Sequence, residues 1–167
     1  MAMADNGNEA RPAAAGGQQS LSVVAQYVKD LSFESPGAPQ SVRARAGAPS
    51  INIGVNVQSR PVQNGEIEVE LKIDAQAREG ESVLFAIELV YGGLFRLTNI
   101  TAENVPLVAM IQCPQLLFPF ARQIIADASR NGGFPPLLLD PIDFVALYQQ
   151  RMSQARGPGA IVPPPTN

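Results

Sequence analysis

The sequence contains no histidine, no tryptophan and only one cysteine among its 167 residues. Histidine is the usual general base near neutral pH and the commonest metal ligand in proteins. Its absence excludes serine–histidine and cysteine–histidine catalysis within this chain, and it excludes histidine-ligated zinc. A single cysteine forms no internal disulfide, which fits a reducing compartment, so we expect a cytoplasmic protein.

Charged residues are also scarce. They make up 16% of the chain, below the usual share of about a quarter, whereas hydrophobic residues make up 46%. The net charge of −3 argues against a nucleic-acid backbone as partner. A chain of this length forms about one domain, with a core of ordinary size.

The two ends differ from the middle of the chain. Residues 1–19 are rich in Ala, Gly, Gln and Asn, which predicts a disordered tail, and they lack the apolar segment of a secretory signal. Residues 155–167 are rich in Pro and Gly and predict a second disordered tail. The predicted folded domain is therefore residues 20–154.

Strand signals fill the first half of that domain. Alternation and β-branched residues predict four strands, at Leu21–Phe33, Ile51–Val57, Glu66–Ala75 and Ser82–Tyr91. Asn64-Gly65 predicts a hairpin between the second and third strands, and Gly92-Gly93 is expected to end the fourth. Short turns between successive strands favour an antiparallel sheet with one apolar face.

Helix signals follow, at Thr101–Gln112, Pro114–Arg130 and Pro141–Met152. Pro119 predicts a kink, and Asp140 before Pro141 predicts the start of the last helix. The expected fold class is α+β: a four-stranded antiparallel sheet with a long kinked helix and a short C-terminal helix packed on one face.

The stretch Val105–Ala121 has no charged side chain and contains three prolines. It is too short and too broken by proline to span a bilayer, so we expect no direct membrane insertion. The predicted helix at Pro114–Arg130 is apolar on more than one side, which is more than a one-sided core requires. Large exposed apolar patches are usually covered by another chain, so this stretch predicts self-association.

The third predicted strand places Glu66, Glu68, Glu70 and Asp74 on one face, with Lys72 as the only base among them. Two interpretations remain open. The acids can form the solvated outer face of any one-sided sheet, or they can form a negative surface that attracts a basic partner.

Candidates for chemistry are few. Cys113 has no nearby cation before Arg122, so we expect a buried thiol rather than a reactive one. Gly92-Gly93 lacks the spacing and the lysine of a phosphate-binding loop. A small enzyme that uses Cys113, or the carboxylate pair Glu79 and Glu81, remains an alternative. No catalytic, metal or cofactor site is predicted.

Four segments carry a family resemblance: Tyr27–Pro36, Tyr91–Phe95, Cys113–Arg122 and Phe134–Leu137. They resemble SecB, the bacterial protein-export chaperone family, and the likeness runs from about Leu21 to Met152. The resemblance implies a homotetramer, a dimer of dimers. It also implies an ATP-independent holdase that binds unfolded secretory precursors and delivers them to the SecA translocation motor. A SecB-like chaperone dedicated to a toxin–antitoxin partner is the alternative.

The resemblance also implies residue roles. It assigns SecA binding to Asp30, Glu34, Ala86 and Glu88. It assigns client binding to Ile51, Ile53, Val55, Phe144, Tyr148 and Met152. The chain departs from the family pattern at Ala86, where a leucine is frequent, and it has no tryptophan in the loop before Ile51.

Overall fold

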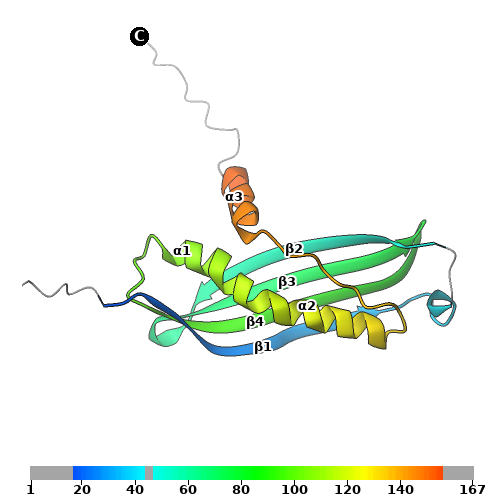
Figure 1. Cartoon of the computed structure of the whole chain (residues 1–167), viewed down its shortest axis with the longest axis horizontal. Helices are drawn as coiled ribbons and strands as arrows, with labels where there is room; N and C mark the ends of the chain where they lie inside the picture. The colour runs from blue at the N-terminus through cyan, green and yellow to red at the C-terminus, as the bar shows by residue number, and fades with distance from the viewer. Residues whose placement is uncertain (1–16, 44–46, 156–167) are drawn as a thin grey trace, which may run out of the picture.

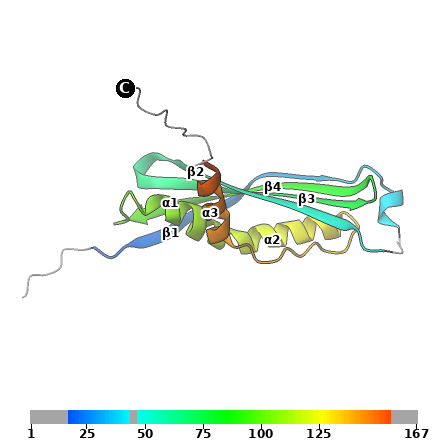
Figure 2. The same ribbon diagram turned by 90° about the horizontal axis from the view of Figure 1, so that it is seen from above.

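The computed structural model describes residues 17–43 and 47–155. Four long strands form one layer, and the long helical segment after them lies against one face of it, whereas the last helix projects away (Figures 1 and 2). The strands are β1 (Ser20–Glu34), β2 (Ser50–Pro61), β3 (Glu66–Glu79) and β4 (Ser82–Thr98). The helices are α1 (Val105–Leu107), α2 (Cys113–Asn131) and α3 (Phe144–Ala155). The predicted α+β fold class is confirmed.

The sheet is antiparallel throughout, in the order β1-β4-β3-β2, so β1 and β2 are its edges. Alternate side chains of β3, among them Val69, Leu71 and Ile73, are buried on the helix-facing side, as the alternation predicted. Leu117 and Ile125 of α2 are buried in the same core. The helix α2 crosses β4 and β3, which leaves the helix-facing side of β2 largely uncovered (Figure 1).

The turn between β2 and β3 is the predicted Asn-Gly hairpin. Asn64 and Gly65 have φ angles of 62° and 71°, the left-handed region in which asparagine and glycine are favoured. Gly80, at the β3–β4 turn, has a φ angle of 57°. These turns set the register in which the apolar faces of β2, β3 and β4 coincide.

The prediction that Gly92-Gly93 ends the fourth strand is wrong, because β4 continues through both residues to Thr98. The missing side chains of the two glycines leave space for neighbouring side chains, one on each face of the sheet. A Cβ atom on Gly92 would lie 2.6 Å from Cε2 of Tyr27, and one on Gly93 would lie 2.8 Å from Cδ2 of Leu117. Close approach of neighbouring side chains, and not a turn, explains both residues.

The prediction of two separate helices before Gly132 is also wrong. Helical structure runs without a break from Val105 to Asn131 through a π-helical segment, Val108–Gln112. Pro114 lacks an N–H group, and the wider π-helical turn just before it carries the helix past that position. Pro119 lies inside α2 without ending it.

This helical run of 27 residues is long and apolar enough to cross a membrane by length and composition alone. The central helix of a soluble protein meets the same criteria. Here Leu117, Ala121 and Ile125 of α2 are fully buried in the core formed with the sheet. We therefore interpret the run as a core helix.

The last helix begins three residues later than predicted, at Phe144 instead of Pro141. Asp143, and not Asp140, caps it: Oδ1 of Asp143 accepts a hydrogen bond of 2.9 Å from the backbone N–H of Ala146. The ring of Phe144 packs edge-on against Phe118 at 6.2 Å and anchors the start of the helix. From there α3 projects outward beside β2 (Figure 1).

Candidate functional site

An open apolar groove lies along the helix-facing side of β2. The side chains of Ile51, Ile53, Val55 and Val57 share this face, because their partners on β3 all belong to the core. Ile51 and Ile53 remain 41% and 43% exposed, whereas Val57 is buried. We call this strip and the hollows at its two ends the β2 groove.

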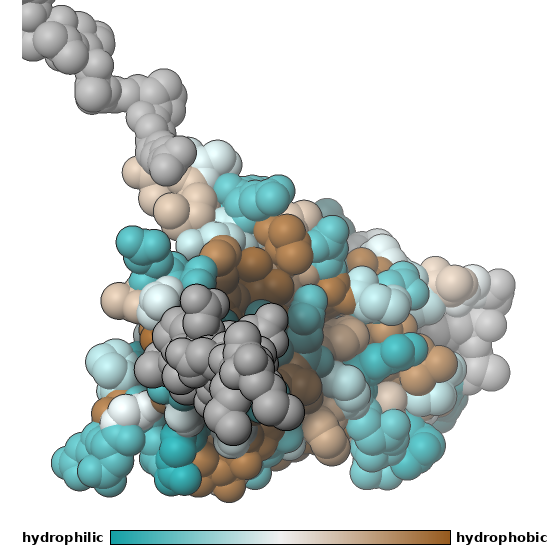
Figure 3. All heavy atoms as spheres, turned by 60° about the vertical axis from the view of Figure 1, so that its left-hand side comes forward, coloured by the Kyte–Doolittle hydropathy of each residue, from teal (hydrophilic) through white to brown (hydrophobic). Residues whose placement is uncertain are grey.

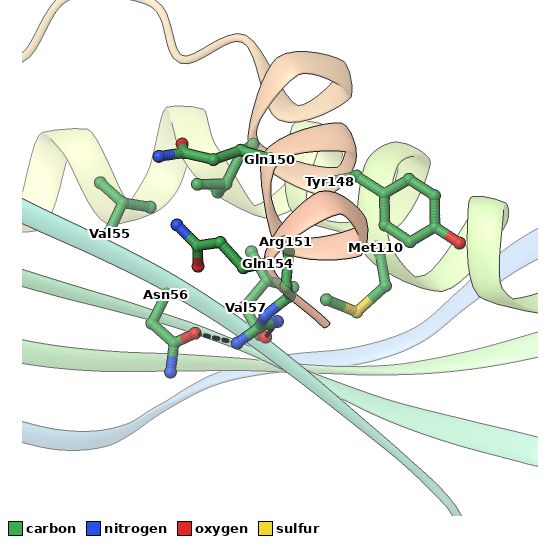
Figure 4. Close-up of a pocket in the computed structure, with 9 residues that line it drawn as sticks. Val55, Asn56, Val57, Met110, Tyr148, Gln150, Arg151 and Gln154 are labelled. Atoms are coloured by element: carbon green, nitrogen blue, oxygen red, sulfur yellow. Dashed lines mark hydrogen bonds between the residues drawn. The ribbon is translucent and has the colours of Figure 1, made fainter. Parts of the chain in front are cut away.

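The first hollow lies where α3 meets β2 and has a volume of about 280 Å³ (Figure 4). Val55 and Val57 of β2, Met110 of the π-helical segment, and Leu147 and Tyr148 of α3 form its apolar wall. Polar side chains of α3 form the other wall: Gln150, Arg151 and Gln154. Apolar surface gathers just below the projecting α3 in the space-filling view (Figure 3).

The second hollow lies near the start of β2 and has a volume of about 440 Å³. Its lining includes Pro49, Leu84 and Phe134, the last of which packs against Phe85 with ring centroids 4.7 Å apart. Phe134 belongs to the segment that joins α2 to α3. The helical half of the chain, which begins at Val105, therefore supplies part of the lining at each end of the β2 groove.

Arg151 connects α3 to β2 (Figure 4). Its guanidinium donates hydrogen bonds of 2.5 Å to the backbone carbonyl of Val57 and to Oδ1 of Asn56. Hydrogen bonds with a charged donor are stronger than neutral ones. Arg151 therefore fixes the outer half of α3 over the end of the β2 groove.

The structure brings some of the predicted client-binding residues together and separates others. Val55 and Tyr148 line the same hollow, and Ile51 and Ile53 extend the same face of β2. Phe144 is only 1% exposed, so it anchors α3 instead of facing the groove. Met152 is 41% exposed but does not line the hollow.

Sequence reasoning missed Met110, Arg151 and Phe134 as parts of the groove. Arg151 follows Phe144 by seven residues and Tyr148 by three, which puts all three on one side of a helix. That spacing was available in the sequence. The position of Met110 was not, because it depends on the π-helical segment.

The predicted SecA-binding residues lie together on the face of the sheet that no helix covers. Glu34 is paired directly with Ala86 across β1 and β4, and Ser32 with Glu88. Asp30 is one pair further along on the same face. Next to Ala86 the face has a hollow of about 260 Å³, whose lining includes Gly54, Asp74 and Glu88.

Bases of the neighbouring strands pair with the acids at the start of β3, Glu66, Glu68 and Glu70. Arg96 of β4 lies 2.6 Å from Glu66. Lys29 of β1 contacts Glu68 at 3.2 Å and also Glu70, and Arg60 of β2 pairs with Glu68. This half of the outer face is therefore nearly balanced in charge.

Acidic charge is instead in excess at the other half of the outer face. Asp30, Glu34, Asp74 and Glu88 gather there, and Lys72 lies 3.4 Å from Asp74 and 3.5 Å from Glu88. We call these four carboxylates the acidic half-face. Three of the four, Asp30, Glu34 and Glu88, are predicted SecA-binding residues.

Glu68 is the buried centre of the balanced half, with 5% of its surface exposed. The guanidinium of Arg60 and the hydroxyl of Tyr27 hold the pKa of its carboxyl at about 2. Glu68 joins β1, β2 and β3 through these groups, so it stabilises the sheet.

The residues considered for catalysis have no suitable surroundings. The thiol of Cys113 is fully buried, and burial raises its pKa to about 12, which disfavours the thiolate. Glu79 is the last residue of β3, and Glu81 lies in the turn before β4. No group of three or more potential metal ligands occurs within residues 17–43 and 47–155.

A sheet with helices on one face, an open apolar groove and an acidic outer half-face defines an α+β binding protein, with surfaces suited to contact. Comparison with known proteins makes this specific. The family model of SecB, the preprotein translocase subunit, matches residues 14–155. The chain belongs to the SecB family.

Individual relatives agree with this assignment. The protein-export protein SecB of Xanthobacter autotrophicus is 61% identical over 81% of this chain and 86% of its own length. The SecB protein of a Bradyrhizobium strain is 52% identical over 95% of this chain and 98% of its own length.

One solved structure is similar in fold. It is a SecB-like chaperone of Mycobacterium tuberculosis in complex with a ChAD peptide from the HigA1 antitoxin, with a TM-score of 0.62. The two chains are 13% identical over 73% of this chain and 90% of the other. The likeness supports the α+β fold described above.

Proposed function

We propose that this protein is an ATP-independent export chaperone that binds unfolded precursor proteins in the β2 groove and delivers them to the SecA motor. The observation that carries the proposal is the groove itself, a strip of exposed aliphatic side chains along an edge strand in a chain of the SecB family. The proposed activity consists of binding and release and includes no chemical reaction.

The groove supports binding of many different sequences. Burial of apolar surface contributes about 25 cal/mol per Å² without directional bonds, so client side chains need only be apolar. The edge of β2 adds backbone groups with which an extended client can pair. A folded protein hides both its apolar side chains and its strand edges, so selectivity for non-native chains follows.

We infer that the protein works as a homotetramer, a dimer of dimers. A second apolar surface supports this. Val23, Val28 and Leu31 of β1 lie on the helix-facing side, because their β4 partners Phe95, Tyr91 and Leu89 are buried there. All three remain exposed at an edge strand.

Exposed apolar side chains of α2 add to this surface. Phe120 is 52% exposed although its ring stacks on Tyr91 at 6.4 Å, and Leu116 one turn earlier is exposed as well. A continuous apolar patch of this kind is usually covered by another chain. Several copies would place several β2 grooves near one client, which raises avidity through effective concentration.

The acidic half-face is the surface that we assign to SecA. A carboxylate cluster attracts a basic partner and speeds its arrival. It lies on the opposite side of the sheet from the β2 groove, so client and motor can be bound together. Transfer then depends on competition by the motor. We place this activity in the cytoplasm, where precursors meet the motor before export.

A narrower role is the second candidate, a chaperone dedicated to one toxin–antitoxin partner. The observation that favours it is the fold shared with the mycobacterial chaperone, which is bound to an antitoxin peptide. The identity of 52% to 61% with protein-export relatives favours the broader role.

Capture of denatured proteins tests the proposal. Several unrelated secretory precursors, diluted from denaturant, should stay soluble with this protein and without nucleotide. They should pass to SecA when it is added. Capture of one antitoxin alone would support the narrower role, and aggregation of every precursor would refute both.

A further inference from the structure

Arg151 occupies a hydrogen-bonding position on the open edge of β2. Among the described residues, the strand partner of β2 is β3, and the N–H of Val62, just after β2, also donates to a β3 residue, Glu66. The carbonyl of Val57 accepts from Arg151 of α3, so this carbonyl points away from β3, toward the free edge. In a strand, backbone groups two residues apart point to the same side.

It follows that Ile53 and Val55 also direct their backbone N–H and C=O groups to the free edge. The side chains of these two residues lie on the floor of the β2 groove. A client strand added here would bond to the edge and rest apolar side chains on the groove at the same time. At Val57 the same strand would meet Arg151.

We propose that Arg151 is a gate that sets where a client strand stops on β2. This inference rests on the proposed client-binding function and assigns a positioning role within it. The guanidinium takes the acceptor that a client N–H would use at Val57. Client pairing therefore covers Ile53 and Val55 and ends before Val57, unless the client displaces Arg151.

The attachment of α3 supports a movable gate. Phe144 is buried and Asp143 caps the first turn, so the start of the helix is fixed. From Gln149 to Ala155 every residue is exposed. In this outer half, Arg151 reaches β2 through two hydrogen bonds (Figure 4). Loss of those two bonds frees the Val57 carbonyl without disturbing the buried anchor.

The test is residue-resolved amide hydrogen exchange of the full protein, with and without a denatured secretory precursor. In the wild type we expect the precursor to protect the amides of Ile53 and Val55 but not those of Val57 and Ser59. In Arg151→Met, which keeps the aliphatic stem and loses the donors, protection should extend to Val57 and Ser59. Precursor affinity should rise about two- to tenfold, the range of one net hydrogen bond.

Two further variants separate the gate from mere docking of α3. Asn56→Ala removes one of the two acceptors and leaves the Val57 carbonyl occupied, so the boundary of protection should stay where it is in the wild type. Gln149→Met alters an exposed side chain of the same helix outside the hollow and should also leave it unchanged.

The outcomes are distinct. The same boundary and the same affinity in wild type and Arg151→Met would overturn the gate while leaving the chaperone function intact. An equal shift of the boundary in Asn56→Ala would also overturn it, because helix docking would then be the cause. A wild type that protects no β2 amide and binds no precursor would refute the proposed function itself.

Discussion

The hydroxyl of Tyr27 on β1 donates a hydrogen bond of 2.5 Å to Oε1 of Glu68 on β3, although β4 lies between the two strands. The tyrosine ring reaches across Gly92 of β4, where a Cβ atom would lie 2.6 Å from the ring. A glycine in the middle strand therefore allows a contact between its two neighbours.

Gly92→Ala should destabilise the protein by about 1–3 kcal/mol, because the added methyl group overlaps the Tyr27 ring. Gly54→Ala is the matched control, since its Cβ would meet nothing closer than 3.7 Å on the same face. Denaturant unfolding at a fixed protein concentration measures both. Equal stability of the two variants would show that the crossing of Tyr27 over β4 does not matter.

Glu68 gives the stability a defined dependence on pH. Its folded pKa of about 2 lies below the ordinary value of 4.5, so its stabilising effect is complete above pH 4.5 and is lost as pH falls toward 2. Glu68→Gln should cost about 1–3 kcal/mol at pH 7. The difference from wild type should shrink between pH 4.5 and pH 2. A difference that is constant over this range would contradict the ion-pair explanation.

Glu88→Lys should weaken SecA binding at least about tenfold, because it places a like charge opposite a basic partner. Client capture should be unchanged, since Glu88 lies on the face opposite the β2 groove. Glu103→Lys, an exposed change of the same charge outside the acidic half-face, is the control. Surface-bound SecA titrated with each variant gives the comparison. Equal losses of SecA and client binding would count against the assignment.

Tyr148→Asp should lower client affinity by about 1–2 kcal/mol, because it puts a charge in the apolar wall of the first hollow. Gln149→Asp introduces the same charge at the next, exposed position and should have little effect. Titration of a labelled denatured precursor measures both, after the oligomer mass has been checked. Unchanged affinity in Tyr148→Asp would remove this residue from the client site.

The sheet could be predicted from the sequence because its signals are local. The alternation of Ile67, Val69 and Leu71 and the Asn64-Gly65 turn determine strand and hairpin by nearest-neighbour chemistry. The predictions were wrong where the structure depends on more than the local sequence pattern. Gly92 was predicted to end a strand, because its contact with Tyr27 cannot be read from the sequence. Pro114 was predicted to begin a separate helix, because the sequence does not reveal the π-helical turn before it.

The site was predictable to a smaller extent. The strand face of Ile51, Ile53 and Val55 follows from alternation, whereas the two hollows arise only when α3 and the segment before it dock on the sheet. The charge balance of the outer face could not be predicted for the same reason. Lys29 and Arg60 are distant in sequence from Glu68 and become neighbours only through strand pairing.

The central claim is that one copy has more apolar surface than it covers and uses the excess to bind its own copies and unfolded chains. Phe120→Asp tests the source of that excess, with Val62→Asp, an exposed apolar residue at the β2–β3 turn, as the control. We expect Phe120→Asp to reduce the oligomer mass and Val62→Asp to leave it unchanged. A full-size oligomer in Phe120→Asp would place the interface elsewhere.

The most direct measurement is the light-scattering mass of the purified protein, alone and with an unfolded precursor. We expect a particle of four times the 17.7 kDa chain mass, which gains the mass of the precursor on mixing. A 17.7 kDa monomer whose mass does not change with the precursor would contradict the claim.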